Sequence, residues 1–170
     1  MRLSEFEELY RSHLAGLFAF LVYRSGDRAL AEDLTAETFA RALDKRSRFD
    51  RRRASEKTWL YTIALNLLRD HLRHVEAEDR AMQRVETLAA VAASGGGPAV
   101  AAVELVETRD ELEHALVVLS PEERDAISLR YGAGLTIPEI AQVTGQQQTT
   151  VDGRVYRALR KLRSELGPGR

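Results

Sequence analysis

A short stretch near the C-terminal end of the chain carries hydroxyl and arginine side chains at a spacing that suits contact with nucleic acid. On a helix, these side chains would lie opposite an apolar stripe that faces inward. A helix fits the major groove of DNA, where side chains near its N-terminus reach base edges and arginines also bind phosphates. The candidate DNA-contacting residues of this stretch are Gln148, Thr149, Thr150, Arg154 and Arg157.

The residues before this stretch predict the first part of a helix-turn-helix. Thr136, with Glu139 three residues later, is a capping-box pattern that starts a short helix. Gly145 breaks that helix, and a second one begins near Thr149. A helical hairpin with a solvated basic face is the alternative interpretation, because helix-turn-helix patterns alone are only moderately specific.

Two residues inside the second helix oppose tight DNA binding. Asp152 suits the positive end of the helix dipole but repels phosphate. Gly153 destabilises a helix interior by roughly 1 kcal/mol relative to alanine. Either the glycine permits a close approach of the backbone, or the affinity is weak and depends on a partner.

A second basic segment lies in the first half of the chain. Arginines crowd residues 46–53, shortly before two helical aromatic residues and an amide. Arginine clusters bind phosphate backbones, and aromatic or amide side chains can receive unstacked bases. The alternatives are a solvated charge run and, for the aromatic residues, packing in a core. Two separated segments suggest recognition of an extended target at two sites. The candidates here are Arg48, Arg51, Arg52, Arg53, Trp59, Tyr61 and Asn66.

An acidic cluster occupies the predicted helix that precedes the basic segment. Glu32, Asp33 and Glu37 are available on its outer side. Such a cluster is more often a solvated helix face, but it could equally dock on a basic protein surface.

Several kinds of chemistry lack the residues that they need. The chain has no cysteine, and its four histidines show no zinc-ligand spacing. There is no glycine-rich phosphate loop and no grouping of a nucleophile with a base, so we expect no enzymatic activity, cofactor, metal or small-molecule substrate. The acidic N-terminal segment is unlike a signal peptide and no apolar run could span a bilayer, so we expect a cytoplasmic protein without membrane insertion.

Helical periodicity extends over nearly the whole chain, and no segment predicts a β-strand. In the first half, a capping-box pattern at Ser4 and Glu7 starts one helix, a second covers about 28–45, and a third begins near Ser55. In the second half, residues 105–119 are amphipathic, and three further helices begin near Ser120, Thr136 and Thr149. The sequence therefore predicts an all-α fold.

A glycine run divides this helical chain. Around Gly95–Gly97 the apolar pattern is lost, which is typical of a flexible linker. We expect two small helical domains, residues 1–77 and 105–170, joined by a linker over residues 78–104. The second domain would contain the helix-turn-helix.

Three motifs, in this order along the chain, resemble those of the extracytoplasmic-function sigma factors, group IV of the sigma-70 superfamily. Residues 31–39 are similar to the region that grips the clamp coiled coil of the largest polymerase subunit. Residues 48–50 and 58–66 are similar to the promoter-melting region. Residues 119–124, 140–141 and 150–158 are similar to the second DNA-binding domain. The resemblance leaves only the linker unmatched.

The resemblance implies an alternative sigma factor that binds core RNA polymerase, directs it to specific promoters and helps to melt the −10 element. The first domain would hold a base of the non-template strand in a pocket near Asn66, since extruding a base costs a few kcal/mol that the pocket contacts must offset. The helix around 149–157 would enter the −35 major groove. An anti-sigma protein is a further expected partner. The clamp contact would fall to Glu32, Asp33, Leu34 and Glu37.

The sequence departs from the family pattern at a few positions. Ala36 stands where the family usually has glutamine, within the clamp-binding motif. Asp152 and Gly153 replace a basic–small pair, and Gln146 replaces an apolar residue in the turn. These departures concern the strength and sequence of −35 recognition and not the fold. A helix-turn-helix regulator that acts without polymerase, and a protein-binding adaptor, remain the alternative functions.

Overall fold

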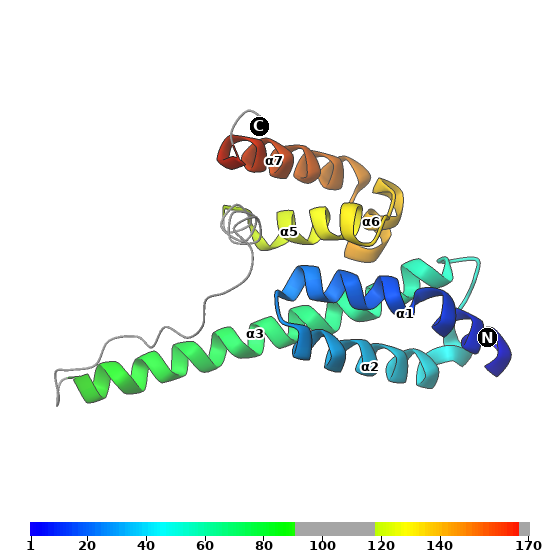
Figure 1. Cartoon of the computed structure of the whole chain (residues 1–170), viewed down its shortest axis with the longest axis horizontal. Coiled ribbons are helices and arrows are strands. Elements are labelled where there is room, and N and C mark those ends of the chain that lie inside the picture. The colour runs from blue at the N-terminus through cyan, green and yellow to red at the C-terminus, as the bar shows by residue number, and fades with distance from the viewer. Residues whose placement is uncertain (91–117, 167–170) are drawn as a thin grey trace.

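The computed structural model describes residues 1–90 and 118–166, and every regular element in those ranges is a helix, which confirms the all-α prediction. Figure 1 shows three helices of the first half packed together and the helices of the second half lying over them. The elements are α1 (Leu3–Ser25), α2 (Arg28–Lys45), the 3-10 turn η1 (Arg46–Arg48), α3 (Glu56–Ala90), α5 (Pro121–Ile127), the π-helical turn η2 (Ser128–Gly132), α6 (Ile137–Thr144) and α7 (Gln148–Leu166).

Polar side chains start the helices of the second half as the sequence predicts. The Ser120 hydroxyl accepts a hydrogen bond from the Glu123 amide at 3.2 Å, and the Glu123 carboxylate accepts one from the Ser120 amide at 2.9 Å. Thr136 and Glu139 form the same reciprocal pair at the start of α6. These bonds satisfy amides that have no partner within the first turn of a helix.

The capping box expected at Ser4 and Glu7 is wrong. Helix α1 begins earlier, at Leu3, and the Arg2 amide donates to the Glu5 carboxylate at 2.6 Å. The helix therefore begins two residues before the start that a cap at Ser4 would set.

We expect the second domain to lose stability in acid through these caps. Burial alone would raise the pKa of Glu123, but hydrogen bonds from Lys161 and the Ser120 amide, with nearby positive charges, hold it below its ordinary 4.5. The hydrogen bond from the Thr136 amide likewise lowers the pKa of Glu139. A lowered pKa in the folded state stabilises the protein above 4.5, and that stabilisation is lost as the pH falls through the folded value. Thermal melts between pH 7 and pH 3 check this, and Glu123→Gln should flatten the dependence.

The core of the first half is built from apolar residues of α1, α2 and α3. Leu17, Phe20 and Leu21 of α1 are fully buried against α3, where Leu65 and Leu68 have no exposed surface. The Phe20 and Tyr61 rings meet edge to face, with 5.3 Å between their centroids. This packing fixes which face of α3 turns outward. The outward face carries the exposed Asn66.

The core of the second half is smaller, and a tight turn separates its last two helices. Leu129, Leu135 and Ile140 are fully buried, and Val151 joins them from α7. Gly145 closes the turn between α6 and α7 at φ 69°, a left-handed conformation that glycine adopts without strain. The expected break at this glycine is confirmed. The turn sets the angle at which α7 leaves the domain.

Helix α3 is longer than the sequence indicates. It continues to Ala90, although the linker was expected to begin at residue 78. Alanine, glutamate, glutamine and arginine are frequent in this stretch, and their high helix propensity favours the extension. The rest of the expected linker, and residues 105–117 of the amphipathic segment, lie outside the described residues.

The two halves are in direct contact. The π-helical turn η2 packs on α1, and α6 packs on α3 (Figure 1). The Lys57 ammonium donates to the Gly134 carbonyl at 3.3 Å, and the Gln142 amide donates to the Arg53 carbonyl. Hydrogen bonds between side chains of one half and backbone carbonyls of the other therefore help to hold the two halves together.

Candidate nucleic-acid interface

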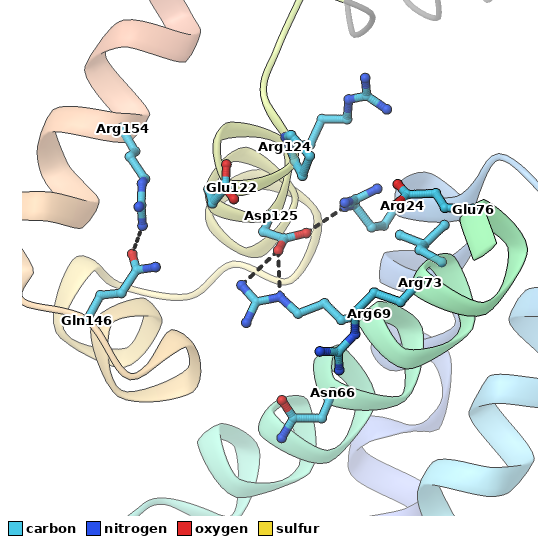
Figure 2. Close-up of a pocket in the computed structure, with 12 residues that line it drawn as sticks. Arg24, Asn66, Arg69, Arg73, Glu76, Glu122, Arg124, Asp125, Gln146 and Arg154 are labelled. Carbon is cyan, nitrogen blue, oxygen red and sulfur yellow. Dashed lines mark hydrogen bonds and ion pairs between the residues drawn. The ribbon is translucent and has the colours of Figure 1, made fainter. Parts of the chain in front are cut away.

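A cleft of about 720 Å³ lies where the two halves meet, and arginines from both halves line it (Figure 2). Asn66, expected to bind a −10 base, and Arg154, expected to bind −35 DNA, both line this cleft. The two candidate DNA-reading surfaces therefore partly face each other. The arginines at the cleft are Arg24, Arg69, Arg73, Arg124 and Arg154.

A buried carboxylate joins the halves at this cleft. One carboxylate oxygen of Asp125 on α5 accepts from the Arg24 Nε at 2.8 Å, and the other accepts from the Arg69 Nε at 2.9 Å. The side chains of Asp125 and Arg24 are only 4% and 6% exposed, and that of Arg69 is 32% exposed. Both oxygens are thus occupied by guanidinium groups of the first half (Figure 2). Sequence reasoning missed these three residues.

The start of α7 presents the residues expected to read −35 DNA. Gln148, Thr149 and Thr150 are exposed, as a base-reading helix end requires. The Arg154 guanidinium donates to the Gln146 side chain, so the polar residue in the turn positions this arginine (Figure 2). Arg157 lies 3.9 Å from Glu123, a distance at which the ion pair is weak.

Gly153 has a local steric role. A Cβ at this position would lie 3.3 Å from the Arg157 guanidinium. A larger residue would press on this guanidinium, which lies at the end of a flexible side chain and can shift aside. Asp152 beside it is exposed.

The basic loop is exposed, but acidic neighbours hold two of its arginines. Arg51 donates to Glu56 at 2.7 Å, and Arg52 donates to Asp50 at 3.2 Å. These exposed pairs are individually weak, so a phosphate can displace the carboxylates at little cost. The side chains of Arg48 and Arg53 are also exposed.

The three candidates on α3 have different environments. Tyr61 is 2% exposed in the core, and burial raises its pKa to about 12. Trp59 is half-buried with its ring 4.9 Å from that of Phe49. Asn66 is exposed in the cleft. Core packing is therefore correct for Tyr61, which acts by positioning α3, whereas Asn66 is free to meet a ligand.

The acidic cluster lies on the exposed face of α2. Glu32, Asp33 and Glu37 are all exposed, while Leu34 is 7% exposed and packs in the core. Glu37 accepts from Arg41 at 2.6 Å, and Glu32 pairs with Arg28 at 3.3 Å. The carboxylates are available to a partner. The buried Leu34 packs in the core and so fixes the position of the helix that carries them.

An apolar hollow of about 510 Å³ adjoins this acidic face and was not expected from the sequence. It lies between α1 and α2, and Ala36 is part of its wall. The helical spacing of Tyr10, Leu14, Phe18 and Phe39 predicts inward-facing positions, yet these residues line an open hollow. The apolar residues of the hollow are Tyr10, Leu14, Ala15, Phe18, Ala36 and Phe39.

None of the helices within 1–90 and 118–166 combines the length and apolar character needed to cross a bilayer. The same ranges hold no cluster of three side chains that could ligate a metal ion.

Comparison with known proteins matches the two halves separately and in order. Residues 9–77 match the family described as Sigma-70 region 2, and residues 109–162 match Sigma-70, region 4. The ECF RNA polymerase sigma factor BldN of Streptomyces coelicolor is 32% identical over 92% of this chain, which spans 58% of BldN. The RNA polymerase sigma factor CarQ of Myxococcus xanthus is 32% identical over 95% of this chain and 89% of CarQ.

The chain belongs to the extracytoplasmic-function sigma factors. This sigma factor is a transcription initiation factor that directs RNA polymerase to promoters. The acidic α2, the basic loop and Asn66 lie in its region 2, and the helix-turn-helix lies in its region 4.

Two solved structures resemble the sigma factor over both regions together. The sigma factor RpoE of Bartonella quintana, in complex with the anti-sigma factor NepR, matches with a TM-score of 0.72 and 26% identity over 99% of this chain and 100% of RpoE. CnrH, in complex with the cytosolic domain of CnrY, matches with a TM-score of 0.69 and 25% identity over 97% of this chain and 89% of CnrH. The closed packing of regions 2 and 4 is therefore compatible with a fold already seen in sigma factors.

Proposed function

We propose that this sigma factor binds the clamp of core RNA polymerase through the exposed carboxylates of α2 and reads promoter DNA with its two regions. The observation that carries the proposal is that both sigma-70 regions match, in order, on one chain. The exposure of Glu32, Asp33 and Glu37 supports the clamp contact, because charged groups at a protein surface steer a partner of opposite charge.

Region 2 would recognise and melt the −10 element. Asn66 has the exposed amide that a flipped base requires, with donors and an acceptor for its Watson–Crick edge. Arg48, Arg51, Arg52 and Arg53 would hold the phosphates on either side. Trp59 would contribute a partly exposed ring, with Phe49 supporting its position.

Region 4 would bind the −35 element through the N-terminal part of α7. Thr149 and Thr150 would face base edges, with Gln148 beside them. Arg154 and Arg157 would bind bases or phosphates once they leave Gln146 and Glu123. Since one glutamine and one distant carboxylate hold them, this exchange costs little.

An anti-sigma protein is the partner that we propose for the inactive state. The solved relatives RpoE and CnrH are bound to NepR and to the CnrY cytosolic domain. The apolar hollow between α1 and α2 suits an apolar segment of such a partner. A partner seated there would also cover Glu32 at the edge of the hollow and so compete with polymerase.

Charge reversal on α2 tests the clamp contact. We expect Glu32→Lys, Asp33→Lys and Glu37→Lys together to weaken binding to core polymerase by roughly 10- to 100-fold, because like charges then meet across the interface. Surface plasmon resonance with immobilised core polymerase measures this affinity. Circular dichroism melts should change little, since the two exposed helix pairs that are lost, to Arg28 and Arg41, contribute only about 0.3–0.5 kcal/mol each.

Glu7→Lys with Glu8→Lys is the charge-reversal control: it reverses two exposed carboxylates of α1 outside the proposed contact, where the α2 variant reverses three. Unchanged polymerase binding by the α2 variant would contradict the assignment. If the unmodified chain binds duplex DNA tightly but forms no complex with core polymerase, it acts as a helix-turn-helix regulator instead.

A further inference from the structure

Asp125 makes the most buried ionic contact between the two regions among the described residues. Its two oxygens receive guanidinium groups from different helices of region 2, Arg24 at the end of α1 and Arg69 on α3 (Figure 2). The carboxylate side chain is 4% exposed. Two arginine forks around one anion are an arrangement that suits carboxylate and phosphate equally.

The surroundings of Asp125 carry more positive than negative charge. Five arginines and three carboxylates line the cleft, which leaves an excess of two positive charges. Burial and the neighbouring Arg24 lower the pKa of Arg124, and its buried Nε has no hydrogen-bond partner among the described residues. Asp125 therefore neutralises the cleft only in part, and an additional anion would be stabilised there.

The arginines that Asp125 occupies adjoin the proposed base-reading residue. Asn66, Arg69 and Arg73 follow each other at intervals of three and four residues, so they form one stripe along α3. Arg69 is one turn, about 4.5 Å along the axis, from Asn66. All three line the cleft, and so does Arg24. When region 4 moves away, region 2 presents a cationic strip that continues from Asn66.

We propose that Asp125 is an internal substitute for a DNA phosphate. In the closed structure its carboxylate occupies Arg24 and Arg69, and these two arginines contact the phosphate backbone of promoter DNA once the regions separate. The proposal rests on the proposed function and adds two DNA contacts and a competing group to it. It also explains how the contact can be exchanged: desolvation of a buried ion pair largely cancels its attraction, so a phosphate can replace the carboxylate at a small net cost.

Two variants weaken the contact at Asp125, and only one of them should tighten DNA binding. Asp125→Asn frees both arginines and should tighten binding of a fluorescent single-stranded DNA of mixed sequence by roughly tenfold, the scale of a typical coupling between sites. The plot of log affinity against log salt should steepen by about 1.4, because each new phosphate contact on a single strand adds about 0.7. Arg69→Ala removes one of the two ion pairs of the closing contact, but it also removes a phosphate ligand, so it should not tighten binding.

Fluorescence anisotropy of the full chain at several salt concentrations measures both quantities. Glu122→Gln is the matched control, since it removes one carboxylate from the same helix and cleft without freeing Arg24 or Arg69. Asp125→Asn combined with Arg24→Ala and Arg69→Ala should return the salt dependence to that of the unmodified chain. Circular dichroism establishes that each variant is folded. If Arg69→Ala is unfolded, Asp125→Glu takes its place as the comparison. This variant keeps the charge, so it should bind DNA no more tightly than the unmodified chain.

The proposal is overturned if Asp125→Asn binds DNA no better than the unmodified chain, or if Asp125→Asn and Arg69→Ala shift the affinity in the same direction. These measurements contain no polymerase. Failure of the proposed function would instead appear as absent promoter-dependent transcription with core polymerase, so the two failures are distinguishable.

Discussion

Replacing Asn66 by alanine is expected to reduce promoter-dependent transcription by roughly 10- to 100-fold, because the pocket contacts that offset base extrusion amount to a few kcal/mol. The side chain is exposed and makes no part of the core, so the fold should be retained. Run-off transcription with core polymerase on a duplex promoter measures the effect. A template opened in advance over the −10 element should recover part of the activity, since the cost of unpairing is then already met.

His74→Ala is a suitable control for this variant, as an exposed residue further along α3 that does not line the cleft. Equal transcription by Asn66→Ala and the unmodified chain on the duplex template would remove Asn66 from the promoter-reading surface. The melting of the −10 element would then have to be assigned to the basic loop alone and not to α3.

Replacing Phe20 by alanine is expected to destabilise region 2 by about 3–5 kcal/mol, the usual effect of emptying a buried phenylalanine site. Phe20 has no exposed surface, and its ring lies 5.3 Å from that of Tyr61, centroid to centroid. Small domains have about 5–15 kcal/mol of stability, so much of the region would be unfolded at 37 °C. Urea unfolding followed by circular dichroism measures the loss.

Tyr156→Ala is the matched surface substitution for stability, since it also truncates an aromatic residue but at a site that is 68% exposed. It should change the free energy of unfolding by less than about 0.5 kcal/mol. A loss below about 1 kcal/mol for Phe20→Ala would mean that the α1–α3 contact is not the centre of the region 2 core.

Local chemistry made much of the fold predictable. Ser120 and Thr136 each precede a glutamate by three residues, and both pairs form the reciprocal caps that start α5 and α6. Gly145 ends α6 at a position that needs a left-handed backbone conformation. These signals act over one helical turn, so a single sequence contains all the information. Helix α3 continues to Ala90, into the stretch that we expected to belong to the linker, where residues of high helix propensity are frequent.

The cleft could not be predicted, because its residues are far apart in the chain. Asp125 is 101 residues from Arg24 and 56 from Arg69, and no spacing rule relates them. The same limit explains the hollow near Ala36, which depends on where α3 leaves α1 and α2 uncovered. The residue types of the DNA-reading candidates were predictable. Their exposure, as for Asn66 against Tyr61, required the packing of three helices.

In-vitro transcription with core polymerase over a library of randomised −35 and −10 segments tests the central claim most directly. We expect transcripts to start downstream of two recurring elements, with Asn66→Ala losing selection at the −10 element and Arg154→Ala with Arg157→Ala losing it at the −35 element. Transcription no greater than that of core polymerase alone, or starts without any recurring element, would contradict a sigma factor that reads promoters with these two surfaces.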